Sequence, residues 1–339
     1  IDCNASRMGL FNTTFIDNYA YIGGALCREI NATDGHGKNN TFANNTAEYA
    51  GAALAWLNAT HISINTYYFY NNHVGYSGGA IYVGEGSKNC EILNCVFDNN
   101  WVENETDGHG GAIEWYSEKG TVYNSNFTNN YAHDGGAIYV GSGSGEINVT
   151  KSTFSDNYAF TTGGAISIGA SSVTVNESNF YDNRAVNGGA LYVGGNGTTN
   201  YIYSSIFEGN NATGGDGGAI YWVASSATIQ DSALTGNYAN YGGGIYFGGK
   251  AAESRIYNCN FTDNHARYKG GAIDCNSSAM YLTNTTFDSN YAQFGAALCR
   301  EENAKGGHGD NNTFINNHAY ISGAALGWMG SVNITIINY

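Results

Sequence analysis

Short stretches of alternating apolar and polar residues recur along the whole chain. In Ala137-Ile138-Tyr139-Val140 aliphatic side chains alternate with a polar-tipped one, which is the period of a half-buried β-strand. A second strand is predicted before each phenylalanine of the repeat described below, with an aliphatic residue five positions earlier, as at Val149 and Ile202. No stretch is long enough in the helical period to form an amphipathic helix. The pattern therefore predicts an all-β protein.

The predicted strands belong to a repeat marked by two short motifs. A phenylalanine followed three residues later by an asparagine recurs at spacings of 26 to 30 residues, and Leu234 takes the place of the phenylalanine in one copy. The phenylalanines are Phe15, Phe42, Phe69, Phe97, Phe127, Phe154, Phe180, Phe207, Phe261, Phe287 and Phe314. The asparagines are Asn18, Asn45, Asn72, Asn100, Asn130, Asn157, Asn183, Asn210, Asn237, Asn264, Asn290 and Asn317. Most copies are followed by a Gly-Gly-Ala-Ile/Leu element, as at Gly78 to Ile81.

The repeat predicts the fold. Units of this size with short strands and glycine corners cannot bury an apolar face alone, whereas stacked units can. If each unit is one coil that rises about 4.8 Å, the amides of an interior coil bond to the coils above and below. The complete absence of proline agrees, because proline cannot donate to a β-ladder. We predict a right-handed parallel β-helix of about twelve coils, continuous as one domain over residues 1–339.

This geometry gives the repeated residues structural roles. The phenylalanines are expected to stack inside, and the small polar residues two positions earlier, such as Ser152 and Ser205, to form an internal hydroxyl ladder. The asparagines are expected to bond along the axis at a corner, since an amide both donates and accepts and asparagine tolerates the left-handed conformation. The glycine pairs are expected to form another corner.

The sequence also contains a longer repeat that comprises several coils. Residues 1–67 align without gaps with residues 273–339, a shift of 272 residues, with 40 of 67 positions identical. The shift corresponds to ten coils. Tandem duplication of a ten-coil block explains it, and we interpret the chain as a fragment of a longer protein.

Charge and hydropathy exclude some functions. The net charge is −15, and the 13 basic residues form no stripe that could follow a phosphate backbone, so nucleic acid is not expected as a partner. No apolar run approaches the roughly 18 residues that span a membrane. An acidic surface suits solubility and the binding of divalent cations.

The paired motifs, Phe-x-x-Asn and Gly-Gly-Ala-Ile/Leu/Val, resemble the repeat of the chlamydial polymorphic outer membrane proteins. With the tyrosine- and asparagine-rich composition, the chain is similar to the adhesin-like surface proteins of methanogenic archaea. The resemblance covers the whole chain. It implies a pectate-lyase-like β-helix, display at the cell surface or outside the cell, and a role in attachment.

No catalytic or cofactor-binding residues are predicted. Asp156 and Asp182 occupy one position in adjacent coils, but asparagine stands there in other coils, so we interpret them as variants of an asparagine ladder. Arg255, Arg267 and Lys269 are the only concentration of basic residues, which we interpret as part of a surface ion-pair network.

Two matching loops are candidates for metal binding. They contain Asp34 and His36 in one case and Asp107 and His109 in the other, each within an Asp-Gly-His-Gly sequence. A glycine-rich turn accounts for both, and Ca²⁺ held by carboxylates and loop carbonyls is the alternative.

Outward-facing tyrosines are the candidate ligand surface. Tyr192, Tyr221 and Tyr246 share one position in three successive coils, and Tyr82 and Tyr139 are equivalent. Their flat rings would suit sugars or a partner protein. The alternative is that tyrosine pairs between coils only stabilise the sheet surface.

The remaining candidates concern modification. Asn104 and Asn196 lie in loop sequons that would accept glycans on an exported protein. Cys95 and Cys259 replace serine or threonine in the hydroxyl ladder and are expected to be buried. Cys3 and Cys275 are expected to face inward and Cys27 and Cys299 outward, which argues against Cys3–Cys27 and Cys275–Cys299 disulfides unless a corner bulge reverses the direction. An exposed Cys27 or Cys299 could instead bridge to another chain.

We therefore predict a non-enzymatic, cell-surface or extracellular adhesin stalk. Its partners would be glycans or proteins on a host, a neighbouring cell or a matrix, and weak contacts repeated on a rigid surface would supply avidity. Self-assembly into a fibre or sheath is the structural alternative, and a polysaccharide lyase or glycosidase is the enzymatic one.

Overall fold

The fold is described from a computed structural model. It describes residues 1–4, 7–29, 32–169, 172–195, 197, 200–249, 251–277, 279–331 and 335–337. The chain forms about twelve turns of a parallel, all-β solenoid, which confirms the predicted fold class. None of the described residues lies in a helix, so no apolar helix of membrane-spanning length occurs among them. The chain divides into two compact units, Ile1–Val173 and Thr174–Tyr339.

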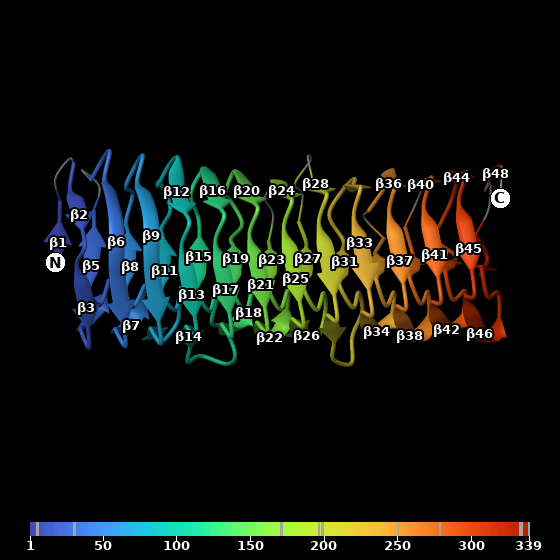
Figure 1. The fold of residues 1–339 in the computed structure, drawn as a ribbon, viewed down its shortest axis with the longest axis horizontal. Helices are drawn as coiled ribbons and strands as arrows, with labels where there is room; N and C mark the ends of the chain where they lie inside the picture. Colours follow the sequence, from blue (N-terminus) through green and yellow to red (C-terminus); the bar gives the residue numbers. More distant parts are fainter. Residues whose placement is uncertain are drawn as a thin grey trace. The chain divides into compact units, whose positions relative to one another are not determined.

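In the first unit each complete turn supplies strands to three parallel sheets, named A, B and C here (Figure 1). Sheet A contains β1 (Asp2–Cys3), β5 (Leu26–Arg28), β8 (Leu54–Trp56), β11 (Ile81–Val83), β15 (Ile113–Trp115), β19 (Ile138–Val140) and β23 (Ile166–Ile168). Sheet B contains β2 (Gly9–Phe11), β3 (Thr14–Ile16), β6 (His36–Ala43), β9 (Ser63–Tyr70), β12 (Cys90–Leu93), β13 (Val96–Asp98), β16 (Lys119–Tyr123), β17 (Asn126–Thr128), β20 (Glu146–Thr150) and β21 (Thr153–Ser155). Sheet C contains β4 (Tyr19–Ile22), β7 (Thr46–Ala50), β10 (His73–Val74), β14 (Trp101–Val102), β18 (Tyr131–Asp134) and β22 (Tyr158–Thr162). β24 (Ser172–Asn176) begins at the end of this unit and belongs to sheet B.

The second unit repeats the arrangement. Sheet A contains β27 (Leu191–Val193), β31 (Ile220–Trp222), β35 (Ile245–Phe247), β39 (Ile273–Cys275), β43 (Leu298–Arg300) and β47 (Leu326–Trp328). Sheet B contains β25 (Asn179–Tyr181), β28 (Asn200–Tyr203), β29 (Ile206–Glu208), β32 (Thr228–Gln230), β33 (Ala233–Thr235), β36 (Ser254–Tyr257), β37 (Asn260–Thr262), β40 (Met280–Thr283), β41 (Thr286–Asp288), β44 (Gly307–Asp310), β45 (Thr313–Ile315) and β48 (Thr335–Ile337). Sheet C contains β26 (Arg184–Ala185), β30 (Asn211–Ala212), β34 (Tyr238–Tyr241), β38 (His265–Lys269), β42 (Tyr291–Phe294) and β46 (His318–Ser322).

The repeated phenylalanines form the interior stack. Phe97 is the register partner of Phe69 on one side and of Phe127 on the other, with ring centroids 4.6 Å away in both cases. In the second unit Phe180 and Phe207 stack at 4.6 Å. The rings are fully buried in the middle coils, so each coil places the same apolar surface against the next.

The asparagine three residues after each phenylalanine satisfies buried polar groups in the adjoining coils. Asn130 Oδ1 accepts hydrogen bonds from both the backbone nitrogen and the Nδ2 of Asn100, each at 3.0 Å. Asn130 Nδ2 in turn donates to the carbonyl oxygen of Phe97 at 3.1 Å. Asn130 is completely buried, so the amide replaces hydrogen bonds that water would otherwise supply.

The left-handed corner lies one residue earlier than predicted. Asn129, not Asn130, has a positive φ of 54°, and the same position holds Asp156 in the next coil and Asp182 in the second unit. Asparagine and aspartate tolerate this conformation better than other side chains. Both aspartates are exposed and stand at this corner position.

The glycine pairs form a further corner in each turn. Gly135 has a φ of 63°, and a Cβ atom at this position would lie 2.3 Å from the carbonyl oxygen of Ile138. Only glycine can bring the backbone this close without a clash. The corner directs the chain from sheet C into sheet A, whose outer surface carries the candidate residues.

Candidate ligand-binding face

Alternate side chains of sheet A point away from the core and form a column along successive coils, called the outer column here. In the second unit, Tyr192, Tyr221 and Tyr246 are register partners on β27, β31 and β35. The rings of Tyr192 and Tyr221 stack with centroids 5.4 Å apart and an interplanar angle of 8°, and those of Tyr221 and Tyr246 at 5.1 Å and 17°. All three side chains are half-buried.

Stacking changes what the tyrosines can offer a ligand. The ring faces of Tyr221 lie against its two neighbours, so the flat surface expected for sugar stacking is covered by the column itself. A ligand would meet ring edges and a row of hydroxyl groups that can donate or accept hydrogen bonds. Burial raises the pKa of Tyr246 to about 12, so its hydroxyl keeps its proton at neutral pH.

The outer column of the first unit is interrupted. Glu114 on β15 is the register partner of both Tyr82 and Tyr139, so these two tyrosines do not stack on each other. Tyr82 lies instead beside Tyr116, with centroids 6.2 Å apart and tilted by 60°. The ring of His109 stacks on Tyr139 at 4.1 Å. Tyr82 and Tyr139 therefore occupy the same strand position as Tyr192, Tyr221 and Tyr246, as predicted, but they make different contacts.

His109 connects several acidic groups around Glu114. Its Nδ1 lies 3.3 Å from Glu114 Oε1, and its Nε2 lies 3.8 Å from Asp134 Oδ2 and 3.9 Å from Asp107 Oδ1. Tyr116 donates a hydrogen bond to Glu114 Oε1 at 2.9 Å. Burial alone would lower the pKa of His109, but the hydrogen bond and charge of Glu114, aided by Asp134 and Asp107, outweigh burial and raise the pKa.

The two loops considered for metal binding differ. Asp107 and His109 come together and are joined by Glu114 and Asp134, of which sequence reasoning named neither. The signal available was the position of Glu114, where tyrosine stands in other coils.

In the other loop, Asp34 approaches Arg7 at 3.9 Å and His36 packs edge-on against Phe11. Among the described residues, this loop therefore gathers no ligand set around Asp34 and His36.

A buried arginine explains Gly35 in the loop that contains Asp34 and His36. Arg28 is only 4% exposed, and a Cβ on Gly35 would lie 2.1 Å from its Nη2 atom. In the second unit, Arg300 is 2% exposed and donates a hydrogen bond from Nη2 to the carbonyl oxygen of Gly306 at 2.6 Å. Each loop therefore makes room for a guanidinium group inside the coil. The sequence shows both motifs, but does not show that they meet.

At one side of the tyrosine column, the second unit carries a group of carboxylates. Asp274 on β39 is the register partner of Tyr246 and is completely buried. Asp216 is half-buried, and burial, followed by the charge of Glu301, raises its pKa to about 6. Glu301 itself forms an ion pair with Lys269.

Among the described residues, Lys269 is the only one of these three basic residues in an ion pair, so the expected network is not formed there. Lys269 contacts Glu301, whereas the guanidinium groups of Arg255 and Arg267 lie over the rings of Tyr281 and Tyr268, at 5.3 Å and 5.1 Å from the centroids. Cation–π contact, and not charge pairing, accounts for the two arginines.

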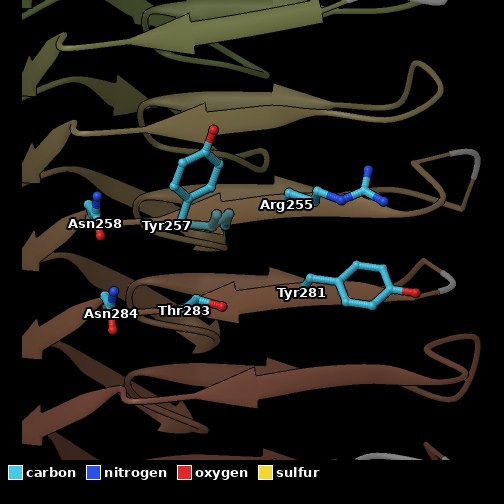
Figure 2. A pocket seen from close by; sticks show the side chains of 7 residues that line it. Arg255, Tyr257, Asn258, Tyr281, Thr283 and Asn284 are labelled. Carbon is cyan, nitrogen blue, oxygen red and sulfur yellow. The ribbon is translucent and has the colours of Figure 1, made fainter.

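A shallow cavity of about 420 Å³ lies over the outer surface of β36 and β40 in the second unit. Figure 2 shows the Arg255 and Tyr257 side chains projecting from one strand and those of Tyr281 and Thr283 from the next. Asn258 and Asn284 close one side. The lining offers one positive charge, two aromatic rings and three uncharged polar groups.

The cysteines are reduced in the structure. Cys95 and Cys259 are buried within the hydroxyl ladder, and burial raises the pKa of each to about 12. Cys27 is half-buried, but the expectation of an exposed Cys299 is wrong, because this residue is completely buried. Cys299 lies in the outer column beside Asp274, so it cannot bridge to another chain without rearrangement.

The two candidate glycan acceptors differ in what the structure describes. Asn104 lies in the loop between β14 and β15, where its Oδ1 accepts hydrogen bonds from the backbone nitrogens of Thr106 and Asp107 at 3.0 and 3.1 Å. Asn104 is half-buried, and Glu105, Thr106 and Asp107 after it are exposed. Asn196 lies outside the described residues.

Comparison with known proteins agrees with this architecture. A family model for the right-handed β-helix region matches residues 29–207, which is more than half of the chain. The chain belongs to the right-handed β-helix family. A Chlamydia polymorphic membrane protein repeat matches residues 258–276 of this β-helix. No curated protein matches its sequence.

Two solved structures resemble the β-helix. Tailspike protein 3 of bacteriophage CBA120 has 10% sequence identity and a TM-score of 0.58, over 98% of this chain and 54% of the tailspike. The chain thus spans about half of the tailspike's length, and the likeness concerns the fold alone. A mannuronic acid specific polysaccharide family 6 lyase from human gut microbiota has 14% identity and a TM-score of 0.38, over 93% of this chain and 78% of the lyase. That value is too low to support an argument.

Proposed function

We propose that the chain is the non-enzymatic attachment segment of a surface-displayed or extracellular protein, and that the outer column of the second unit contacts its ligand. The observation that carries the proposal is the stack of Tyr192, Tyr221 and Tyr246, which places identical polar-tipped rings 5.1 to 5.4 Å apart. The match to a chlamydial membrane protein repeat supports surface display.

The chemistry of the column favours a particular type of ligand. Hydroxyl groups repeated at coil spacing suit an extended molecule that carries its own short repeat of hydrogen-bonding groups, such as a polysaccharide. Each hydroxyl group offers only a single contact, but several equal contacts on one rigid surface add up to avidity. The asparagine and phenylalanine stacks hold the spacing of the column fixed.

A glycan array, followed by binding of the purified chain to the best-scoring polysaccharide, tests this proposal. Tyr221→Ala should remove the central hydroxyl and reduce binding at least tenfold, because two neighbouring contacts are lost with it. Tyr181→Ala is the matched control, since Tyr181 is a half-buried tyrosine on the outer surface of sheet B. Equal loss in both variants, or no loss in Tyr221→Ala, would contradict the assignment of the ligand to this column.

A polysaccharide lyase or glycosidase is the second candidate function. The observation in its favour is Asp216, because burial, followed by the charge of Glu301, raises its pKa to about 6, which suits proton transfer near neutral pH. Burial, followed by the charge of Asp216, raises the pKa of Tyr221. Incubation with acidic and neutral polysaccharides, with detection of new reducing ends and unsaturated products, tests it. Cleavage that Asp216→Asn abolishes would replace the attachment proposal with an enzymatic one.

A further inference from the structure

Lysine and glutamate side chains from different coils meet in the second unit. Lys269, at the end of β38, has its Nζ atom 2.5 Å from Oε1 of Glu301, which follows β43. The side chains are only 24% and 17% exposed. The backbone nitrogen of Glu301 donates to the carbonyl oxygen of Cys275 at 3.0 Å, so the position of Glu301 is set by pairing with the preceding coil.

A buried acid accompanies this pair. Asp274 is completely buried, and neither of its carboxylate oxygens has a hydrogen-bond partner. Burial, followed by the charge of Glu301, raises the pKa of Asp274 well above its ordinary value, and the opposing effect of the Lys269 charge is weaker. Burial therefore favours the neutral, protonated form of Asp274, and its register partner Cys299 lies two residues before Glu301.

An ordinary ion pair leaves part of this arrangement unexplained. Exposed pairs contribute little to stability, and burying both charges costs most of what their attraction supplies. A buried carboxyl group without a partner adds a further cost. A group that is unfavourable for stability, but chemically suited to proton transfer and close to an amine and a carboxyl, indicates a chemical role.

We propose that Lys269 and Glu301 join through an intramolecular amide bond, and that Asp274 carries the proton that the reaction requires. The Nζ–Cδ bond forms and one Cδ–O bond of Glu301 breaks. The ammonium and carboxylate groups together become one amide and one water molecule, so no oxidant, cofactor or net proton is needed. Asp274 gives its proton to the departing oxygen and recovers one from the lysine nitrogen.

The reaction needs the unprotonated amine. Burial lowers the pKa of Lys269, but the hydrogen bond and charge of the ionised Glu301 outweigh burial and raise the pKa. Transfer of one proton from Nζ to the carboxyl group gives a neutral amine beside a neutral acid. Partial burial favours this neutral form relative to water, because desolvation penalises charge. Once formed, the amide closes a loop between coils 32 residues apart and restricts the unfolded chain.

The long repeat supplies an internal control. Asp2, Cys27 and Glu29 occupy the positions that correspond to Asp274, Cys299 and Glu301, and their ligand atoms lie within 4.8 Å of one another. The contact between Lys269 and Glu301 lies entirely within the second unit, so a change at Glu29 should leave it untouched.

The intact mass of the purified 339-residue chain tests the proposal. We expect a mass lower than the sequence mass by one water, and a branched peptide joining the segments around Lys269 and Glu301 after proteolysis in denaturant. Lys269→Arg keeps the positive charge but cannot form the amide, so it should show the full sequence mass of the variant. Glu29→Ala should keep the deficit of one water.

Asp274→Asn separates chemistry from folding. This variant removes the acid while filling nearly the same space, so it should fold with an unchanged circular dichroism spectrum and lose the deficit. A full sequence mass in the folded unmodified chain, or a deficit that survives in Lys269→Arg, would overturn the proposal. A deficit that survives in Asp274→Asn would remove Asp274 from the reaction.

Discussion

The interior asparagine column and the outer column of sheet A occupy the same coils but follow different rules. The interior position holds asparagine in every copy of the repeat. The outer position changes between coils, for example from Tyr82 to Glu114 in the first unit and from Tyr246 to Asp274 in the second.

Hydrogen bonding explains the difference. Each interior amide must satisfy two donors and one carbonyl of adjoining coils, a task that no other side chain performs at that site. The outer column has only to fit a sheet surface. The chemistry that distinguishes one coil from another is therefore found outside, where histidine, carboxylates and lysine gather without disturbing the stack.

The largest effect is expected from removing one interior ring. Phe127→Ala would leave a cavity between Phe97 and Phe154 and should lower the free energy of unfolding by about 3–5 kcal/mol. Urea denaturation followed by circular dichroism measures this loss. A loss below about 1 kcal/mol would show that the phenylalanine stack is not the main apolar core.

Loss of one interior amide should have a smaller effect. Asn130→Ala leaves the Asn100 donors and the Phe97 carbonyl without their partner, which should cost about 1–3 kcal/mol. Asn129→Gly is the matched control at the adjacent exposed corner, where glycine accepts the positive φ, and its effect should stay within about 0.5 kcal/mol. If Asn130→Ala and Asn129→Gly are equally stable, the buried asparagine column is no more important for stability than the exposed corner.

The histidine cluster of the first unit should make stability depend on pH. Because the folded state raises the pKa of His109 above 6.5, the stabilising effect of its charge is complete below about pH 6.5. It is lost as pH rises through the raised pKa. Denaturation at a series of pH values should show this decrease, and His109→Asn should remove it.

His265 in the second unit should make stability depend on pH in the opposite direction. Burial lowers its pKa, so the neutral form is favoured and His265 should destabilise the fold as pH falls below about 6.5. His265→Asn should reduce the loss of stability at low pH. If His109→Asn and His265→Asn show the same dependence of stability on pH, neither histidine controls that dependence.

The smallest effect on stability is expected at the outer column. Tyr221→Phe keeps the ring stack and removes only the hydroxyl group, so the free energy of unfolding should change by less than about 0.5 kcal/mol. Binding to the polysaccharide identified on the array should nevertheless weaken. A large loss of stability would show that the hydroxyl groups maintain the sheet, in which case the column is structural.

The sequence was sufficient to predict the β-solenoid because its repeated residues act between equivalent positions of neighbouring coils. Phe97 lies against Phe127 because the two residues occupy the same position of the repeat in neighbouring coils. The exact corner was not predictable, since Asn129 and Asn130 are both asparagine and both types of site favour that residue.

The clusters of the outer surface were mostly missed, because their members come from unrelated positions of the repeat. Glu114 and Asp134 meet His109 only because an inserted loop brings the imidazole over sheet A. Lys269 and Glu301 likewise meet across the coils and not within a motif. The burial of Cys299 also depends on these neighbours, so strand alternation alone predicted its exposure wrongly.

The residue-for-residue pairing of neighbouring coils has a consequence for how such a gene can change in length. Recombination between its similar segments preserves every ladder only if it adds or removes a whole coil, because a partial one would bring apolar residues opposite polar ones. Viable products would thus differ by discrete steps, and each step would return the tyrosine-bearing side to the same angular position. Length could then evolve while the orientation of the outer surface is inherited unchanged.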